Sequence, residues 1–162
     1  MNLIEPKFFR SVMGLFATGV TVITYKIDGA PAGMTANAFM SVSMDPPLVA
    51  VSVRKHSRFN DYVRMGQSYG VNILAENQEV WSGHFGGKPN AELAVPFVWH
   101  AGMPLIEGSL GNIVASVAAI HETGDHFLYV GHVEHLRLGE QHSPLLFHTG
   151  KYRRIPSSLA SG

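Results

Sequence analysis

Residues 33–47 combine small side chains with side chains that bear hydroxyl or amide groups, in a segment that otherwise has strand character. The run GMTANAFMSVSMDPP carries hydroxyls and one amide where a strand ordinarily alternates apolar and polar residues. Small side chains let a flat molecule approach the backbone, whose N–H and C=O groups match the donor and acceptor edge of a planar heterocycle. A strand rich in glycine and alanine beneath a helix has the same composition, and this segment alone does not decide between the two.

A cluster of positive charge follows. Residues 54–64 hold four of the twelve lysine and arginine residues, and Ser52 and Ser57 lie beside them. A strand that ends in cations and hydroxyls just before a helix begins can bind a phosphate group. A solvated basic loop is the alternative, and it is the simpler interpretation of this segment taken alone.

Nine histidines raise the question of a metal site, because neutral imidazole is the most common zinc ligand. There is no H-E-x-x-H motif, and His132 and His135 point to opposite faces of a strand unless a β-bulge intervenes. No metal site is therefore predicted. His126 differs from the others because it follows a Gly-Asp turn and begins an apolar strand at the predicted mouth of the fold. A functional and a structural role are both open for it.

Three common motifs are missing from the sequence. There is no G-x-G-x-x-G after a strand and no G-x-x-x-x-G-K-[ST], since Gly87 and Lys88 are followed by Pro89. Residues 108–111 lack the G-x-S-x-G spacing that exposes a nucleophilic serine on a strained turn. Rossmann, P-loop and serine hydrolase sites are not expected.

The composition indicates one globular domain. With 162 residues, 46% of them hydrophobic, the chain can bury one core. Twelve Lys and Arg balance twelve Asp and Glu, so no net charge attracts nucleic acid or an anionic membrane. Cysteine is absent, which excludes disulfides and thiolate chemistry. The start lacks signal-peptide features and no apolar run approaches the roughly 20 residues that span a bilayer, so we expect a cytoplasmic protein.

The elements that position these residues follow from periodicity. Helical spacing predicts an amphipathic helix over 5–16, whose apolar face seals one end of the domain. Shorter helices are expected within 54–65 and over 76–85, with a long loop over 86–104. Runs of β-branched and aromatic residues predict strands over 20–27, from 31 onward, and over 48–53, 69–74, 113–121 and 126–138.

These elements favour a mainly β fold, a small antiparallel β-barrel with a few short helices, over a βαβ fold with an open parallel sheet. The apolar strand at 48–53 is expected inside a closed sheet. A single domain is expected over residues 1–156, with the last ordered piece near Tyr152. Residues 157–162 are predicted to form a flexible tail.

Taken in order, these segments resemble the flavin reductase-like proteins, the NAD(P)H:flavin oxidoreductases that serve as the reductase component of two-component flavin monooxygenases. The similarity covers most of the chain. It runs through FATGVTVIT at 16–24, TAN at 35–37, SVSMDPP at 41–47, SR at 57–58, VNIL at 71–74, GDH at 124–126 and PLLF at 144–147.

The resemblance implies a homodimer of split β-barrels that binds FMN or FAD near the subunit interface. Residues 35–37 would line the flavin ring, and Ser52 and its neighbours would flank it. Lys55 and Ser57 would face the phosphate. The cofactor-binding positions that it implies are Met34, Thr35, Ala36, Asn37, Ser41, Ser43, Ser52, Val53, Lys55, Ser57, Phe85, Lys88, His148 and Tyr152.

The resemblance also implies a place for the hydride donor, NADH or NADPH. His126 would lie beside the flavin where the nicotinamide stacks, and Phe85 and Lys88 would cover the site. Hydride transfer between stacked rings needs little acid–base chemistry from the protein, so the lack of a catalytic triad is expected. We expect His126, the one catalytic residue, to position the nicotinamide without being indispensable for the hydride step.

The implied function is an NAD(P)H:flavin oxidoreductase that supplies reduced flavin to a separate monooxygenase. The alternative is a non-catalytic flavin-binding electron carrier or sensor, and a reductase for a bound tetrapyrrole such as cobalamin is a further rival. Reduction of flavin by added nicotinamide separates these classes. The choices between FMN and FAD and between NADH and NADPH stay open, as does the partner's substrate.

Overall fold

A computed structural model describes residues 3–156, so the tail predicted at 157–162 lies outside the described residues. The helices are α1 (Pro6–Met13), α2 (Phe59–Tyr62) and α3 (Glu79–Phe85), with a 3-10 turn η1 (Glu76–Gln78) before α3. The strands are β1 (Thr18–Gly19), β2 (Thr21–Ile27), β3 (Ala30–Ala36), β4 (Phe39–Met44), β5 (Pro47–Arg54), β6 (Ser68–Ile73), β7 (Phe97–His100), β8 (Met103–Ile106), β9 (Gly111–Thr123), β10 (His126–Leu138), β11 (Leu146–His148) and β12 (Lys151–Arg153).

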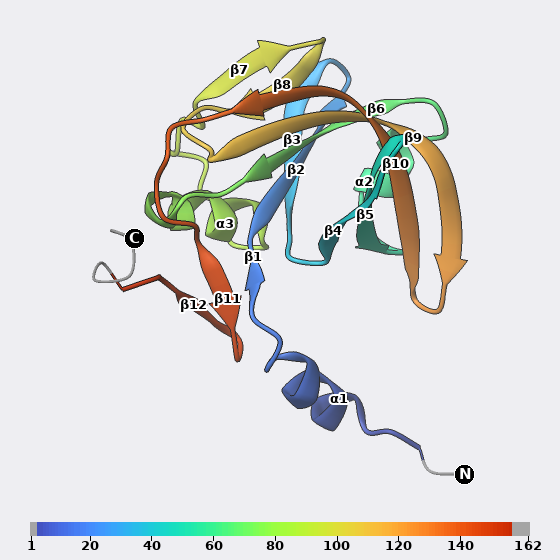
Figure 1. Ribbon diagram of the computed structural model, residues 1–162, viewed down its shortest axis with the longest axis vertical. Helices are drawn as coiled ribbons and strands as arrows, with labels where there is room; N and C mark the ends of the chain where they lie inside the picture. Colours follow the sequence, from blue (N-terminus) through green and yellow to red (C-terminus); the bar gives the residue numbers. More distant parts are fainter. Residues whose placement is uncertain (1–2, 157–162) are drawn as a thin grey trace.

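Seven strands form the main sheet in the order β3-β2-β6-β9-β10-β5-β4, and all of its neighbouring strands are antiparallel (Figure 1). A smaller sheet, β1-β11-β12, lies between the main sheet and α1, and β7 and β8 form a separate hairpin. β3 and β4 are the two edges of the main sheet, and residues 37–38 connect them directly. The pocket described below lies at this connection.

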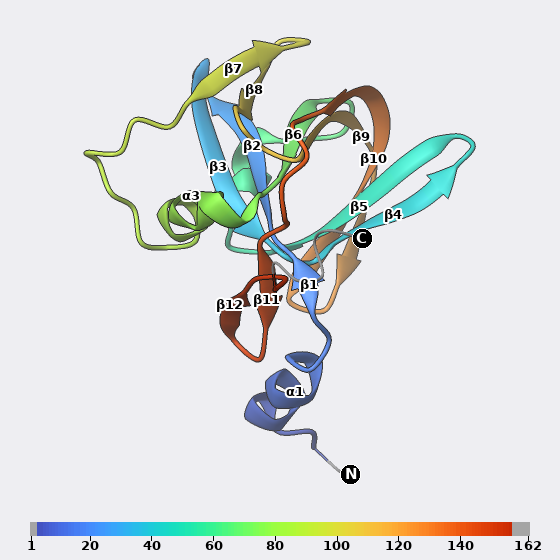
Figure 2. The same cartoon turned by 60° about the vertical axis from the view of Figure 1, so that its left-hand side comes forward.

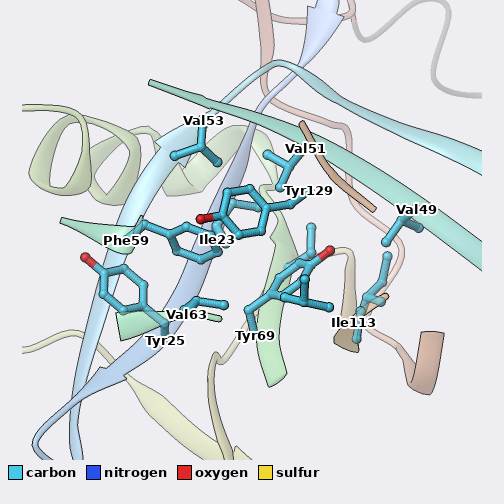
Figure 3. Close-up of a cluster of buried hydrophobic side chains, with 13 residues drawn as sticks. Ile23, Tyr25, Val49, Val51, Val53, Phe59, Val63, Tyr69, Ile113 and Tyr129 are labelled. Atoms are coloured by element: carbon cyan, nitrogen blue, oxygen red, sulfur yellow. The ribbon is translucent and has the colours of Figure 1, made fainter. Parts of the chain in front are cut away.

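The main sheet curls around one core. Ile23 of β2 and Val51 of β5 are far apart in the strand order, yet both are fully buried in the same apolar cluster (Figure 3). The ladder of hydrogen bonds does not close, because β3 and β4 are not paired with each other within residues 3–156. The predicted mainly β fold with a few short helices is confirmed. The strand at 48–53 lies in a curled, open sheet rather than in the closed sheet expected for it.

Phe59 of the short helix α2 fills the centre of this core. It is fully buried, and the rings of Tyr25, Tyr129 and Tyr69 lie edge-on to it at centroid distances of 5.2, 5.0 and 5.9 Å. Tyr129 also donates a hydrogen bond to Oδ1 of Asn60 at 2.7 Å. The Asn60 side-chain amide in turn donates to the backbone carbonyls of residues 54 and 55, which holds the turn that follows β5.

A buried asparagine connects four strands. The amide of Asn72 donates hydrogen bonds to the Val22 carbonyl at 2.9 Å and to Oγ1 of Thr24 at 3.1 Å. Its Oδ1 accepts from the Ile106 N–H and from the Asn112 amide, both at 2.8 Å. Because Asn72 is fully buried and all of these bonds run between strands, it holds β2, β6, β8 and β9 in one register.

The helix predicted over 5–16 is shorter than expected and does not seal the domain. α1 ends at Met13, every one of its residues is exposed, and it projects away from the sheets (Figures 1 and 2). Its large apolar side chains, including Phe8, Phe9 and Val12, face solvent in the single chain. The amphipathic pattern is therefore real, but the surface that it matches is not part of the same chain's core.

The long loop predicted over 86–104 is wrong in its second half. Residues 97–100 and 103–106 form the β7–β8 hairpin, joined by a two-residue turn at Ala101 and Gly102, both with positive φ. The remaining predicted elements are observed, including the long β9–β10 hairpin that turns at residues 124–125. Within residues 3–156, no helix has the length and apolar character needed to cross a membrane.

Tyr69 provides a stability prediction, because its hydroxyl is buried and has no hydrogen-bond partner among the described residues. Burial raises the pKa of Tyr69 to about 12 from an ordinary value of 10.0. We expect Tyr69→Phe to raise the free energy of unfolding at pH 7 by about 1 kcal/mol, because it removes an unsatisfied buried group.

The pH dependence of that effect has a definite sign. The pKa of Tyr69 is higher in the folded protein than in the unfolded one. The resulting contribution to the free energy of unfolding is complete below pH 10 and is lost as pH rises through about 12. The wild type should therefore lose more stability than Tyr69→Phe between pH 9 and about pH 11 in urea denaturation at one protein concentration. A variant that is less stable than wild type at both pH values contradicts this prediction.

Candidate functional site

A pocket of about 420 Å³ lies where the ends of β3, β5, β10 and α3 meet. Its volume is within the range of small-molecule sites. It is lined by Met34, Thr35, Ala36, Asn37, Ala38, Ser52, Val53, Arg54, His56, Ser57, Phe85, Gly86 and His126.

Strand register places one wall of the pocket. His126 of β10 pairs with Arg54 of β5, and the alternation of a strand puts Ser52 on the same face as Arg54. Val53 points the other way, into the core, where it is 2% exposed, so it borders the pocket mainly through its backbone. This wall therefore offers a hydroxyl, a guanidinium and an imidazole from two neighbouring strands.

The opposite wall is the end of β3 and the connection to β4. β3 is an edge strand, and no strand pairs with its outer side within residues 3–156. Alternate backbone N–H and C=O groups on such an edge lack a partner strand and can bind a ligand. The side chains here are small, including Ala36 and Ala38, so a flat molecule can approach this backbone.

The end of α3 borders the pocket through Phe85 and Gly86. Oγ1 of Thr35 donates a hydrogen bond to the Ser82 carbonyl at 2.6 Å, which attaches α3 to β3. The Phe85 ring packs directly over Gly33, where an added Cβ would lie 3.0 Å from the ring. A side chain at Gly33 would therefore crowd the Phe85 ring and displace it.

One end of the pocket carries the polar and basic groups that suit a phosphate. Arg54, His56 and Ser57 lie there, in the turn that Asn60 holds. The Ser57 N–H donates to the Arg54 carbonyl at 3.0 Å, and the Ser57 hydroxyl accepts from the Phe59 N–H at 3.3 Å. The turn is therefore built before any ligand arrives.

His126 is oriented by the residue before it. Its Nδ1 lies 2.7 Å from Oδ1 of Asp125, and this hydrogen bond holds the pKa of Asp125 below its ordinary value. An ionised carboxylate only accepts, so Nδ1 of His126 carries the proton in this pair. In the neutral form of the ring, this tautomer leaves Nε2 as a hydrogen-bond acceptor.

Nine of the fifteen positions expected from the sequence line this pocket: Met34, Thr35, Ala36, Asn37, Ser52, Val53, Ser57, Phe85 and His126. They come from β3, β5, α3 and β10, from the connection between β3 and β4, and from the turn after β5, so the structure brings distant segments together.

The other six expected positions lie outside the pocket lining. Ser41 and Ser43 are on β4, which runs with β5 as a hairpin away from the body of the sheet (Figure 2). Lys55 pairs with Glu122 and lies over the Phe127 ring, 5.6 Å from its centroid.

The remaining three lie around α3 and the small sheet. Lys88 follows α3, and its N–H donates to the Gly83 carbonyl at 3.1 Å. His148 is half-buried on β11, and Tyr152 of β12 bonds to Ser82 rather than lining the pocket.

Four lining residues are not among the expected cofactor-binding positions: Ala38, Arg54, His56 and Gly86. Arg54 and His56 belong to the basic segment 54–64 that the sequence indicates as able to bind a phosphate, and strand alternation puts Arg54 on the same face as Ser52. Ala38 and Gly86 carry no chemical signal, and their position depends on how the β3–β4 connection and α3 pack.

The histidines elsewhere do not gather into a metal site. A β-bulge does interrupt β10 between Val133 and His135, and the His135 ring lies against His100 at a centroid distance of 5.4 Å. Within residues 3–156, no cluster of three or more histidine, aspartate or glutamate side chains could hold a metal ion.

Comparison with known proteins identifies the family. The family described as "Flavin reductase like domain" matches residues 13–156. The chain belongs to the flavin reductase-like family. An NADH-dependent flavin reductase from a Rhodococcus species is 43% identical over 155 residues, covering 94% of this chain and 88% of that protein. The reductase subunit HsaB of a flavin-dependent monooxygenase from Mycobacterium tuberculosis is 40% identical over 157 residues, covering 94% and 83%.

Solved flavin reductase structures share this fold. Flavin reductase PheA2 in its native state superimposes with a TM-score of 0.87 at 41% identity, covering 94% of this chain and 99% of that one. The NADH:FAD oxidoreductase SgcE6 of Streptomyces globisporus, in complex with NAD and FAD fragments, gives a TM-score of 0.84 at 32% identity, covering 96% and 98%. The resemblance stated from the sequence is thereby confirmed at the level of family and fold.

Proposed function

We propose that this protein is an NADH-dependent flavin reductase whose flavin, FMN or FAD, binds in the pocket between β3, β5, β10 and α3. The observation that carries the proposal is the combination of an unpaired strand edge with a basic turn at one end of the same pocket. Family membership and relatives named as NADH-dependent flavin reductases support the same activity.

The residues present fit a flavin. An isoalloxazine ring offers one N–H donor and two carbonyl acceptors along one edge, which suits the free backbone groups of β3. The small side chains at 36–38 leave room for the flat ring. The phosphate that FMN and FAD share suits the turn that holds Arg54 and Ser57.

When bound, the flavin supplies the chemistry of accepting a hydride. The chain's task is to hold two rings at van der Waals distance and to favour the charge that develops. The backbone edge of β3 orients the flavin, and Arg54 binds its anionic end. His126 borders the pocket and offers Nε2 as an acceptor to the carboxamide N–H of the nicotinamide.

The reduced flavin is proposed to leave for a separate oxygenase. The relatives support this, since HsaB is named a reductase subunit of a flavin-dependent monooxygenase. The pocket supports release as well, because one wall is the open edge of β3 and the basic groups lie on a short turn, with no second domain over them within residues 3–156. A cytoplasmic location, where NADH is abundant, remains the expectation from the sequence.

The proposed active form is a homodimer. α1 exposes Phe8 and Phe9 by 66% and 56%, and an isolated eight-residue helix with such a face is marginal in water. A second copy of the chain that packs on this face would bury the exposed phenylalanines and stabilise the short helix. We expect a solution mass twice the 17.6 kDa of one chain, and Phe8→Glu should shift it toward the monomer in light scattering.

A matched control keeps that result specific. Ser11→Glu adds the same charge to α1 but on its polar side, and should leave the dimer intact. A monomeric wild type, or two variants that dissociate equally, contradicts a dimer built on this face.

The function is tested by steady-state oxidation of NADH with FMN or FAD as acceptor, with NADPH in a parallel assay. The proposal predicts turnover with free flavin and a preference for NADH. Tight flavin binding without turnover would instead identify an electron carrier or sensor. Turnover only with a tetrapyrrole acceptor would identify the cobalamin-type rival.

His126→Ala tests the role of the histidine. Loss of one hydrogen bond to the nicotinamide should raise the KM for NADH about three- to fivefold, since such a bond contributes about 1 kcal/mol. The rate at saturating NADH should change by less than about twofold, because the hydride step needs no proton from this ring. The exposed His132, on the same strand but outside the pocket, provides the control variant His132→Ala. An unchanged KM and an unchanged rate in His126→Ala would remove this role.

A further inference from the structure

A short chain of hydrogen bonds connects the C-terminal strand to the pocket. The hydroxyl of Tyr152, on β12, lies 2.5 Å from Oγ of Ser82 on α3. The carbonyl of the same Ser82 accepts the hydrogen bond from Oγ1 of Thr35, which lines the pocket. Three residues distant in sequence, from β3, α3 and β12, are therefore tied at one point.

Ser82 is the centre of this arrangement and is fully buried. α3 has only seven residues, too few to be stable without tertiary contacts. Its apolar side, Trp81 and Phe85, packs on the second core cluster together with Tyr152 and Phe147. Apolar packing is non-directional, whereas a short hydrogen bond to a buried serine fixes both the rotation and the depth of the helix.

The end of α3 has little freedom to move without changing the pocket. A Cβ on Gly86 would lie 2.6 Å from the Ser82 carbonyl, so the backbone turns back closely on itself at this point. Phe85 and Gly86 both line the pocket, and Phe85 is also held over Gly33. A shift of Ser82 would therefore also move three residues that line the pocket, Thr35, Phe85 and Gly86.

We propose that Tyr152 is a positioning residue of the flavin pocket: through its hydrogen bond to Ser82 it holds Thr35, Phe85 and Gly86 where they border the ligand. It does not touch the ligand itself, since it lies outside the pocket lining. This inference rests on the proposed function, because the ligand in question is the flavin. It assigns the flavin affinity in part to the small β1-β11-β12 sheet, which contributes no lining residue.

The test compares two variants that remove the same hydrogen bond from opposite sides, Tyr152→Phe and Ser82→Ala. Binding of FMN to each is measured by quenching of flavin fluorescence, well below the melting temperature of the flavin-free protein. Each single variant is expected to raise the Kd for FMN about three- to tenfold. The double variant should have the same Kd as the single variant with the larger effect, because both substitutions remove one and the same hydrogen bond. At saturating FMN, the turnover of NADH should change by less than about twofold.

Tyr69→Phe is the matched control, because it removes a tyrosine hydroxyl that has no partner in the described chain and does not line the pocket. It should leave the Kd for FMN unchanged. A merely structural role for Tyr152 would lower the melting temperature and leave the Kd at lower temperature as it is.

Four outcomes overturn the inference. They are an unchanged Kd in both single variants, effects that multiply in the double variant, an equal effect in Tyr69→Phe, and a wild type that binds neither FMN nor FAD. The last also overturns the proposed function, whereas the first three leave it intact, so the two failures are distinguishable.

Discussion

Replacing Arg54 by glutamine is expected to weaken FMN binding about tenfold, one of the largest functional effects of any single substitution in this chain. A hydrogen bond to a charged group contributes roughly 1.5–3 kcal/mol, and the exposure of Arg54 places it at the lower end of that range. About 1.4 kcal/mol corresponds to a tenfold change in Kd. Flavin fluorescence quenching measures the effect directly.

The ligand provides an internal control for this prediction. Riboflavin lacks the phosphate, so wild type should prefer FMN strongly and Arg54→Gln should show much less preference. Arg58→Gln removes the same charge from the neighbouring turn but outside the pocket lining, and should behave as wild type. If Arg54→Gln weakens riboflavin and FMN binding by the same factor, the phosphate does not lie at this end of the pocket.

Asn72→Leu is expected to cause the largest loss of stability, lowering the free energy of unfolding by about 3–4 kcal/mol. The substitution leaves the Ile106 N–H and the Val22 carbonyl without their side-chain partner in a fully buried place. Each buried group left unsatisfied costs about 1–3 kcal/mol. Urea denaturation of the flavin-free protein at fixed concentration measures the loss.

Asn112→Ala is the control for Asn72→Leu, because it alters the same part of the core but removes only one of the hydrogen bonds of Asn72. Oδ1 of Asn72 keeps its bond from Ile106 in that variant, so the expected loss is only about 1–2 kcal/mol. A loss below 1 kcal/mol in Asn72→Leu shows that the asparagine does not hold the four strands together.

Much of the fold could be predicted because its signals are local. The β9–β10 hairpin follows from two β-rich runs around a Gly-Asp turn, and the strand at 48–53 from its unbroken apolar run. The β7–β8 hairpin was missed because Pro104 and the Ala101-Gly102 turn give no alternation or strong turn signal. The sequence indicates the helix at the start, but its apolar face is covered by no other segment within residues 3–156.

The site was predictable where residue types are unusual for their element. Thr35 and Ser52 stand out in strands, Asn37 stands out just after one, and His126 stands out after its turn. Which expected positions lie outside the pocket depends on tertiary structure. Ser41 and Ser43 lie in the same sequence window as Thr35, yet β4 leaves the pocket after Phe39 and carries them away.

The positions of Gly86 and Tyr152 also depend on tertiary packing that the local sequence does not indicate. Gly86 enters the lining only because α3 ends over β3, which no local pattern in 79–86 encodes. Tyr152 was expected to contact the cofactor, and its place at Ser82 depends on the packing of β12 against α3.

The most direct test of the account is anaerobic rapid mixing of the protein and FMN with NADH, followed at the oxidised flavin band near about 450 nm. We predict that this absorbance falls within about a second, because flavin reduction at an ordinary enzymatic rate of about 10 per second is complete in that time. FMN that binds but keeps its absorbance after NADH is added would contradict the account, because the pocket would then hold a flavin without reducing it.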